Sequence, residues 1–213
     1  MNKYLPVDSK EPSAEIINYT ASRLMQGAVI VFPTETVYGL GALVDKDIAQ
    51  GAQELFDIKR RPTGIPVPVL VADEDALDVY GIDVPDYAHK LAQEFWPGPL
   101  TIVVKASNLI PREFTNQEDG TVGLRLPDNE VARQLMLATG RPLYATSANT
   151  HGVKPPVSID ELEDSVAEAA SVIIDAGPTQ VRVSSTVVRC TGDEPEVLRE
   201  GPVSAESIME ALA

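Results

Sequence analysis

Apolar positions along the chain recur with two different periods. Spacings of three and four residues are typical of an amphipathic helix, and in the first such segment Ile17, Ala21 and Leu24 share one face before Gly27. Short apolar runs bounded by Gly or Pro indicate buried strands. These patterns predict helices over residues 13–26, after Asp47, and over 86–95, 129–139 and a short segment from 204. They predict strands over residues 28–32, 66–71, 100–104, 121–126, 142–146, 171–175, 184–189 and 196–199.

The order of these elements indicates an α/β fold. Strands interleave with helices along most of the chain, yet strands also follow one another directly around residues 100–126 and 171–199. Parallel and antiparallel neighbours should therefore both occur. No internal repeat, low-complexity tract or long linker separates the periodic segments. We expect one domain over residues 1–213, with an open mixed sheet and helices packed on it.

One more helix is predicted from a local signal. Ser158 and Glu161 have the spacing of a capping box, in which the serine and the glutamate each satisfy a free backbone donor of the first turn. A helix should therefore begin at Ser158.

The composition is that of a folded, strongly acidic protein. The 213 residues include 17 Lys+Arg and 32 Asp+Glu, a formal charge of −15, with 44% hydrophobic residues. Broad electrostatic binding to nucleic acid or an anionic membrane is not expected, because such binding needs a positive field. Any anionic ligand should instead be held by a local group of cations.

Cysteine and histidine are too few for several kinds of chemistry. Cys190 is the one cysteine, so an internal disulfide and a multi-cysteine metal site are excluded, and we expect a buried structural thiol. His89 is expected at the surface, far in sequence from His151. No motif of a zinc protease, dithiol oxidoreductase, serine esterase or P-loop occurs. The N-terminus lacks a hydrophobic leader and no long apolar run is present, so the cytoplasm is the expected location.

Polar clusters follow the predicted strands and carry the remaining chemistry. Thr34, Glu35 and Thr36 come directly after residues 28–32, and glycines at 39 and 41 would let a ligand approach the backbone. The alternative is an ordinary strand-to-helix turn. Gly39-Leu40-Gly41 also begins like a dinucleotide fingerprint, but valine occupies the third glycine position.

Cations form the other clusters. Lys59, Arg60 and Arg61 lie together at the end of a predicted helix, where they could bind an anion or simply complement the helix dipole. Strand alternation places Thr121 and Arg125 on one face, and an arginine at an inner strand position usually has a carboxylate or phosphate partner. Further donors lie at residues 145–149, 184–186 and 199. The set provides cations and hydroxyls without a nucleophile, which favours phosphate binding and catalysis by positioning.

The motifs resemble a known family when they are taken in order. They are PTETVYGLG from residue 33, KRRP from 59, WPGPLT from 96, TVGLRLP from 121, SAN from 147, SSTVV from 184 and VLREG from 197. This series resembles the YrdC-like family of L-threonylcarbamoyladenylate synthases, in its single-domain form, over about residues 27–201. The resemblance implies a twisted mixed α/β sheet with a large concave cavity. It also implies a reaction in which L-threonine, bicarbonate and ATP give threonylcarbamoyl-AMP and pyrophosphate.

The resemblance assigns roles to individual positions. It implies that the catalytic residues are Lys59 and Arg61, which face the ATP phosphates. It implies that the nucleotide is bound by Lys59, Arg61, Thr121, Ser147, Asn149 and Arg199. It implies that threonine is bound by Thr36, Arg125, Ala145 and Ser185. Magnesium is expected with ATP, without a named protein ligand.

Several positions depart from the family pattern. Leu70 replaces a frequent histidine, Pro155 a frequent serine, Ser184 a common glutamate and Arg60 a common glycine. The product would pass to a separate tRNA threonylcarbamoyltransferase machinery. The alternatives are a relative that binds RNA without synthase activity, a paralogue that has lost the activity, and a carbamoyl-transfer domain of a larger maturation enzyme. The paired cations and the SAN motif argue against an inactive paralogue.

Overall fold

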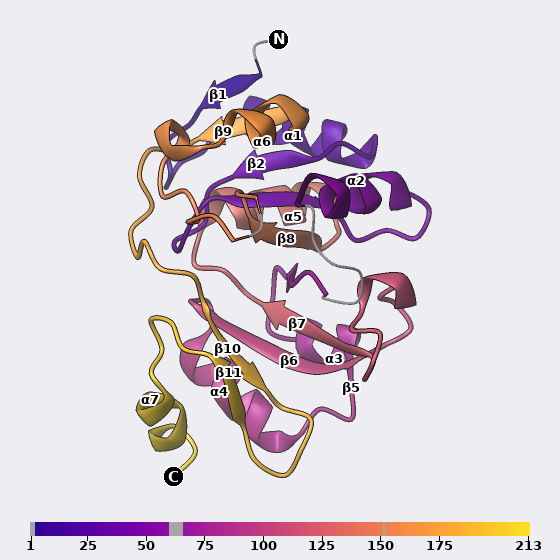
Figure 1. Cartoon of the computed structure of the whole chain (residues 1–213), viewed down its shortest axis with the longest axis vertical. Helices are drawn as coiled ribbons and strands as arrows, with labels where there is room; N and C mark the ends of the chain where they lie inside the picture. The colour runs from indigo at the N-terminus through magenta and orange to yellow at the C-terminus, as the bar shows by residue number, and fades with distance from the viewer. Residues whose placement is uncertain (1–2, 60–65, 151) are drawn as a thin grey trace. The chain divides into compact units, whose positions relative to one another are not determined.

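The computed structural model describes residues 3–59, 66–150 and 152–213. The chain forms two compact units, each built from two separate stretches of sequence (Figure 1). The first unit comprises Met1–Pro62 and Asn129–Arg182, and the second comprises Thr63–Asp128 and Val183–Ala213. Each unit contains its own set of paired strands and its own helices.

The first unit is built on strands in the order β1–β9–β2–β3–β8. The β9 strand pairs in parallel with β1 and β2, whereas β3 pairs antiparallel with both β2 and β8. The strands are β1 (Tyr4–Pro6), β2 (Ile30–Phe32), β3 (Gly39–Leu43), β8 (Leu143–Ser147) and β9 (Val172–Asp175). The helices are α1 (Ala14–Met25), α2 (Ala49–Lys59), α5 (Glu130–Thr139) and α6 (Asp164–Ala169), with a 3-10 turn, η2 (Ile159–Glu161).

Helices α1 and α5 show why the periodic segments fold as predicted. The apolar face of α1 is buried through Ile17, Ala21 and Leu24. At the start of α5 the Asn129 side chain accepts a hydrogen bond from the Ala132 N–H at 3.1 Å, and at its end Gly140 has a φ of 63°. A side-chain cap at the first turn and a left-handed glycine at the last satisfy backbone groups that a helix leaves unpaired.

The second unit has strands in the order β4–β7–β6–β10–β11, and β5 also pairs with β6. The β4–β7 and β6–β10 pairs are parallel, while β6–β7, β5–β6 and β10–β11 are antiparallel. The strands are β4 (Val69–Leu70), β5 (Gly81–Ile82), β6 (Leu100–Ala106), β7 (Thr121–Arg125), β10 (Thr186–Arg189) and β11 (Glu196–Arg199). The helices are α3 (Ala76–Tyr80), α4 (Asp86–Phe95), the 3-10 turn η1 (Arg112–Phe114) and α7 (Ala205–Glu210).

The predicted mixed α/β fold is confirmed, with two local corrections. Residues 33–43 do not form a strand-to-helix turn, because β2 and β3 make an antiparallel hairpin around residues 33–38. The capping box does not start an α-helix either. Ser158 makes no side-chain cap, Glu161 accepts from the Val157 N–H at 3.2 Å, and the segment forms only the turn η2 before α6 begins at Asp164.

Cys190 and His89 both belong to the second unit. Cys190 is buried directly after β10, and burial raises the pKa of its thiol to about 12. His89 is half-buried on α4, where its Nε2 lies 3.3 Å from Asp78 Oδ1. His151 lies outside the described residues. Among the helices that the structure describes, none is long and apolar enough to cross a membrane.

Candidate functional site

The turn between β2 and β3 holds two buried threonine hydroxyls in fixed orientations. Thr34 Oγ1 donates to the Val37 carbonyl at 2.7 Å and lies 2.8 Å from Thr36 Oγ1. A hydroxyl has one proton, so Thr36 is the donor within this pair. The Thr36 carbonyl in turn accepts from Thr179 Oγ1 at 2.9 Å. The Thr36 hydroxyl therefore acts toward a ligand as a hydrogen-bond acceptor.

The glycines after this turn have a packing role that differs from the expected one. We expected Gly39 and Gly41 to admit a ligand, but the ring of Phe32 covers them. A methyl group at Gly41 would lie 2.6 Å from Phe32 Cε1, and one at Gly39 would lie 3.1 Å from it. Glycine is needed here because the buried ring packs directly against the backbone of β3.

Lys59 is the central cation of the first unit. It ends α2 and is 4% exposed. Its ammonium donates to the Ser147 carbonyl at 2.8 Å, Ser147 Oγ at 3.1 Å, the Asn149 carbonyl at 2.8 Å and Asn149 Oδ1 at 2.6 Å. Burying an ammonium is costly unless oxygens replace its water. The contacts join Lys59 to the SAN motif, 88 and 90 residues away.

The end of β8 places this motif beside the threonine turn. In the β3–β8 ladder Gly39 is paired with Ser147 and Gly41 with Ala145, and the Ala148 N–H donates to the Tyr38 carbonyl at 2.9 Å. Ala145 and Asn149 are both buried. The first unit thus brings together Thr36, Lys59, Ala145, Ser147 and Asn149. Arg60 and Arg61 lie outside the described residues.

Two arginines form the corresponding cluster of the second unit. Arg125 ends β7, is 6% exposed, and donates from Nε to the Gly98 carbonyl at 3.1 Å. Arg199 ends β11 and donates from Nε and Nη2 to the Ser185 carbonyl at 3.1 and 2.8 Å. Burial, and then the charge of Arg125, lower the pKa of Arg199. An anion bound beside Arg199 would stabilise its charge against both effects.

Ser185 connects Arg199 to Thr101, a residue that the sequence patterns did not single out. Its Oγ lies 2.9 Å from Thr101 Oγ1 and 3.3 Å from Arg199 Nη2. Thr101 follows the WPGP segment, and the Gly98 carbonyl of that segment is the acceptor for Arg125. The sequence feature that indicates Thr101 is the WPGPLT motif, in which this threonine interrupts an otherwise apolar predicted strand.

Thr121 lies at the opposite end of β7 from Arg125. At about 3.3 Å per residue, the four steps along the strand separate the two positions by roughly 13 Å. Thr121 is 3% exposed, and its hydroxyl donates to Asp119 Oδ1 at 2.7 Å. The structure therefore brings Arg125, Ser185 and Arg199 together and keeps Thr121 apart from them. Among the described residues there is no group of three or more His, Cys, Asp or Glu side chains arranged to hold a metal ion.

Comparison with known proteins identifies the family. The family model Sua5/YciO/YrdC, described as "Telomere recombination", matches residues 22–201. This chain belongs to the Sua5/YciO/YrdC family. The resemblance predicted from the motifs is thereby confirmed.

Two proteins named as synthases are similar to this family member in sequence. The threonylcarbamoyl-AMP synthase of Pyrococcus abyssi is 37% identical over 196 residues, which are 92% of this chain and 57% of that protein. A putative threonylcarbamoyl-AMP synthase of Mycobacterium tuberculosis is 36% identical over 205 residues, which are 96% of this chain and 92% of that protein. The chain thus spans little more than half the length of the P. abyssi relative.

Solved structures of the same family share the fold. The crystal structure of P. abyssi Sua5 complexed with L-threonine matches 99% of this chain and 61% of that chain, with a TM-score of 0.89 and 35% identity. Escherichia coli YciO matches 98% of this chain and 100% of its own, with a TM-score of 0.87 and 28% identity. The mixed α/β architecture is therefore that of the family.

Proposed function

We propose that this protein is a threonylcarbamoyl-AMP synthase, which makes threonylcarbamoyl-AMP and pyrophosphate from L-threonine, bicarbonate and ATP. The observation that carries the proposal is the match of 99% of the chain to P. abyssi Sua5 bound to L-threonine. The synthase names of the relatives favour this activity over the alternative of an RNA-binding protein without it.

The reaction suits a site that has no nucleophile of its own. The threonine amine and bicarbonate form a carbamate with loss of water. A carbamate oxygen then bonds to the α-phosphorus of ATP, and the bond from that phosphorus to the bridging oxygen breaks. The electron pair leaves with pyrophosphate, so negative charge grows on the leaving group. Fixed cations that are already in place stabilise such charge without reorganisation.

The first unit would hold part of both substrates. We assign Lys59 and Arg61 to the phosphates, as catalytic residues, and Ser147 and Asn149 to the nucleotide. Lys59 is pre-positioned for this role by its contacts with the SAN motif. Thr36 and Ala145 are assigned to threonine. The acceptor orientation of the Thr36 hydroxyl suits the amine or hydroxyl of that amino acid.

The remaining assigned residues belong to the second unit. We assign Arg125 and Ser185 to threonine, because a guanidinium binds a carboxylate in a bidentate manner. Arg199 and Thr121 are assigned to the nucleotide. The large concave cavity stays a prediction, as does the single-domain organisation.

The wider setting of the activity belongs to the same proposal. ATP would enter as its magnesium complex, so that the ion arrives with the substrate. The product would pass to the tRNA threonylcarbamoyltransferase machinery of the cytoplasm. Direct RNA binding is disfavoured by the net charge of −15.

The test is release of pyrophosphate by the purified protein with MgATP, threonine and bicarbonate. Product formation, followed by mass spectrometry of threonylcarbamoyl-AMP, should stop when either threonine or bicarbonate is omitted. Unchanged nucleotide turnover without them would show that the proposed reaction is wrong.

Substitutions of single arginines test the assigned roles. Arg61→Ala should raise the KM for ATP, and Arg125→Ala should chiefly raise the KM for threonine. Hydrogen bonds to a charged group contribute about 1.5–3 kcal/mol, which corresponds to an increase of about 10- to 150-fold. Arg133→Ala is the matched control, because that arginine pairs only with Glu130 on α5 among its described contacts. Equal small effects of Arg61→Ala and Arg125→Ala would contradict the assignment.

A further inference from the structure

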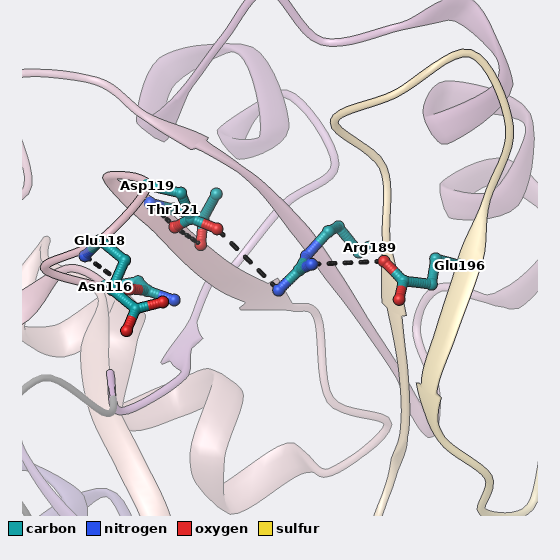
Figure 2. A network of polar contacts seen from close by, with 6 residues as sticks. All are labelled: Asn116, Glu118, Asp119, Thr121, Arg189 and Glu196. Carbon is teal, nitrogen blue, oxygen red and sulfur yellow. Dashed lines mark hydrogen bonds and ion pairs between the residues drawn. The ribbon is translucent and has the colours of Figure 1, made fainter.

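Asp119 holds the hydroxyl of Thr121 in one orientation. Its Oδ1 accepts from the Thr121 hydroxyl at 2.7 Å and from the Thr121 N–H at 3.1 Å (Figure 2). The hydroxyl has one proton and that proton is directed to a carboxylate. Thr121 can therefore offer only lone pairs to a ligand, and a group that it binds must be a hydrogen-bond donor.

Arg189 extends this network across the sheet of the second unit. Its Nη2 lies 3.9 Å from Asp119 Oδ2, and its Nη1 lies 3.3 Å from Glu196 Oε2 (Figure 2). Both ion pairs are partly exposed, so they add little to the free energy of unfolding. Arg189 lies beside Oδ2 of the carboxylate whose other oxygen, Oδ1, accepts from Thr121.

The strand register places Thr121 and the arginine cluster on one face of the sheet. Residues paired in a ladder point to the same face, and Thr121 is paired with Lys105 and Gly123 with Val103. Alternate residues of a strand also point to one face, so Thr121, Gly123 and Arg125 of β7 share a face. The roughly 13 Å between these ends suits one extended ligand or two ligands in a row.

A cavity lies beside the Thr121 end of this face. It has a volume of about 590 Å³ and is lined by Ile82 of β5, by Ala106 at the end of β6 and by residues of the β6–β7 connection up to Asp119 and Gly120, which directly precede Thr121. Ile82 is paired with Lys105, which places it in the same row as Thr121. A volume within about 300–1,000 Å³ is usual for a small-molecule site.

We propose that Asp119 is a positioning residue that fixes Thr121 as a hydrogen-bond acceptor, so that the nucleoside of ATP binds at this end of β7 and its phosphates do not. This inference rests on the proposed function. A ribose hydroxyl or the 6-amino group of adenine can donate to Thr121, whereas an ionised phosphate oxygen cannot. The β7 strand would then have the nucleoside at its first residue and the amino acid carboxylate at its last.

The experiment is a double-mutant cycle on the affinity for ATP, measured by calorimetry with the full chain. Asp119→Ala and Thr121→Val should each raise the Kd for MgATP about 3- to 10-fold, the value of one hydrogen bond. The double variant should bind MgATP about as weakly as Thr121→Val alone, because the proposed effect of Asp119 on the nucleoside requires the Thr121 hydroxyl. Thr121→Ser, which keeps the hydroxyl, should bind like the wild type. Glu94→Ala is the control, because it removes the same charge from an exposed position of α4 that is not among the residues lining the cavity.

Nucleotide analogues identify the donor. We expect one of 2′-deoxyATP, 3′-deoxyATP and purine riboside triphosphate to bind the wild type about 3- to 10-fold more weakly than ATP, and this difference should vanish in Thr121→Val. Tripolyphosphate, which has no nucleoside, should bind both proteins equally.

Three outcomes would overturn the inference. They are additive effects of Asp119→Ala and Thr121→Val, weaker binding of tripolyphosphate by Thr121→Val, and the same discrimination among the analogues with and without the Thr121 hydroxyl. Asp119 also closes the loop before β7, but a purely structural role would lower stability without producing the non-additive affinities. If the wild type binds ATP but releases no pyrophosphate in response to threonine, the proposed function is wrong. The double-mutant cycle would still test the role of Asp119, because it measures ATP affinity and not turnover. A wild type that binds no ATP would refute both.

Discussion

Replacing Gly41 with alanine should destabilise the protein, because the buried ring of Phe32 occupies the space of the added methyl group. The new Cβ would lie 2.6 Å from Phe32 Cε1 and 3.1 Å from the Tyr144 carbonyl oxygen. Phe32 and Tyr144 are both fully buried, so neither can turn toward solvent. The ring or the β3 strand must move instead.

The size of the effect follows from the cost of adding a methyl group to a packed core. Overpacking of this kind costs about 1–3 kcal/mol. For a protein of 150–250 residues each kcal/mol lowers the Tm by about 2–4 °C. The expected change in Tm is therefore a decrease of roughly 2–12 °C.

Thermal and urea unfolding measure this change against two further variants. Gly192→Ala is the control, because no atom lies within 4 Å of the methyl group added there and its φ is not positive. Its free energy of unfolding should stay the same or rise slightly. Phe32→Leu removes the ring atoms that clash, so adding it to Gly41→Ala should cost less than the sum of the single changes.

The same double variant distinguishes packing from ligand access. If Gly41 is needed only for the Phe32 ring, the double variant should recover threonine and ATP affinity together with part of its stability. Full stability of Gly41→Ala alone would refute the packing argument. Recovery of stability without recovery of binding would show that the glycine is needed by the ligand, as the sequence had suggested.

The remaining predictions concern a buried cation, a cavity wall and a thiol. Lys59→Met should lower the Tm and abolish pyrophosphate release, since each buried acceptor left unsatisfied costs about 1–3 kcal/mol; a stable, active variant would contradict the role of its contacts with the SAN motif. Ile82→Trp should raise the Kd for ATP several-fold by filling the cavity that Ile82 lines, whereas Val79→Trp, at an equally exposed position of 47%, should not; equal effects would place the nucleotide elsewhere. Because burial raises the pKa of Cys190 to about 12, the unfolded thiol loses its proton first, and the free energy of unfolding should fall as the pH rises above about 8.5. In urea titrations at pH 8 and pH 10, the Cys190→Ala variant should lack this component, and a constant difference between the two proteins would contradict the assignment.

Periodic sequence patterns predicted most elements of the fold correctly. The helix predicted over residues 86–95 and the strand predicted over residues 196–199 have the same bounds in the structure. Such segments are recognisable because the side chains of a helix or strand follow a local period. The short elements β1, β5 and α3 were missed, because two to five residues contain too few positions to show a period.

The strand β3 could not be recognised in this way. Its sequence Gly-Leu-Gly-Ala-Leu has no side chain at two positions of one face, and glycine usually weakens a strand. The segment forms a strand because it pairs with β2 on one side and with β8 on the other. The ring of Phe32 packs against the two glycines, on the face where they have no side chains.

The sequence contains the residue types of the candidate site and the motif order that identifies the family, because both are properties of the chain read along its length. Its local patterns also predict most helices and strands. They do not specify which side chains meet, because Lys59 reaches the SAN motif across 88 residues and Ser185 reaches Thr101 across 84. Nor do they specify the direction of a proton, which depends on the position of Asp119 beside Thr121. Contacts between distant segments and the orientation of hydroxyl groups arise from strand pairing and packing, and these come into existence only when the chain folds.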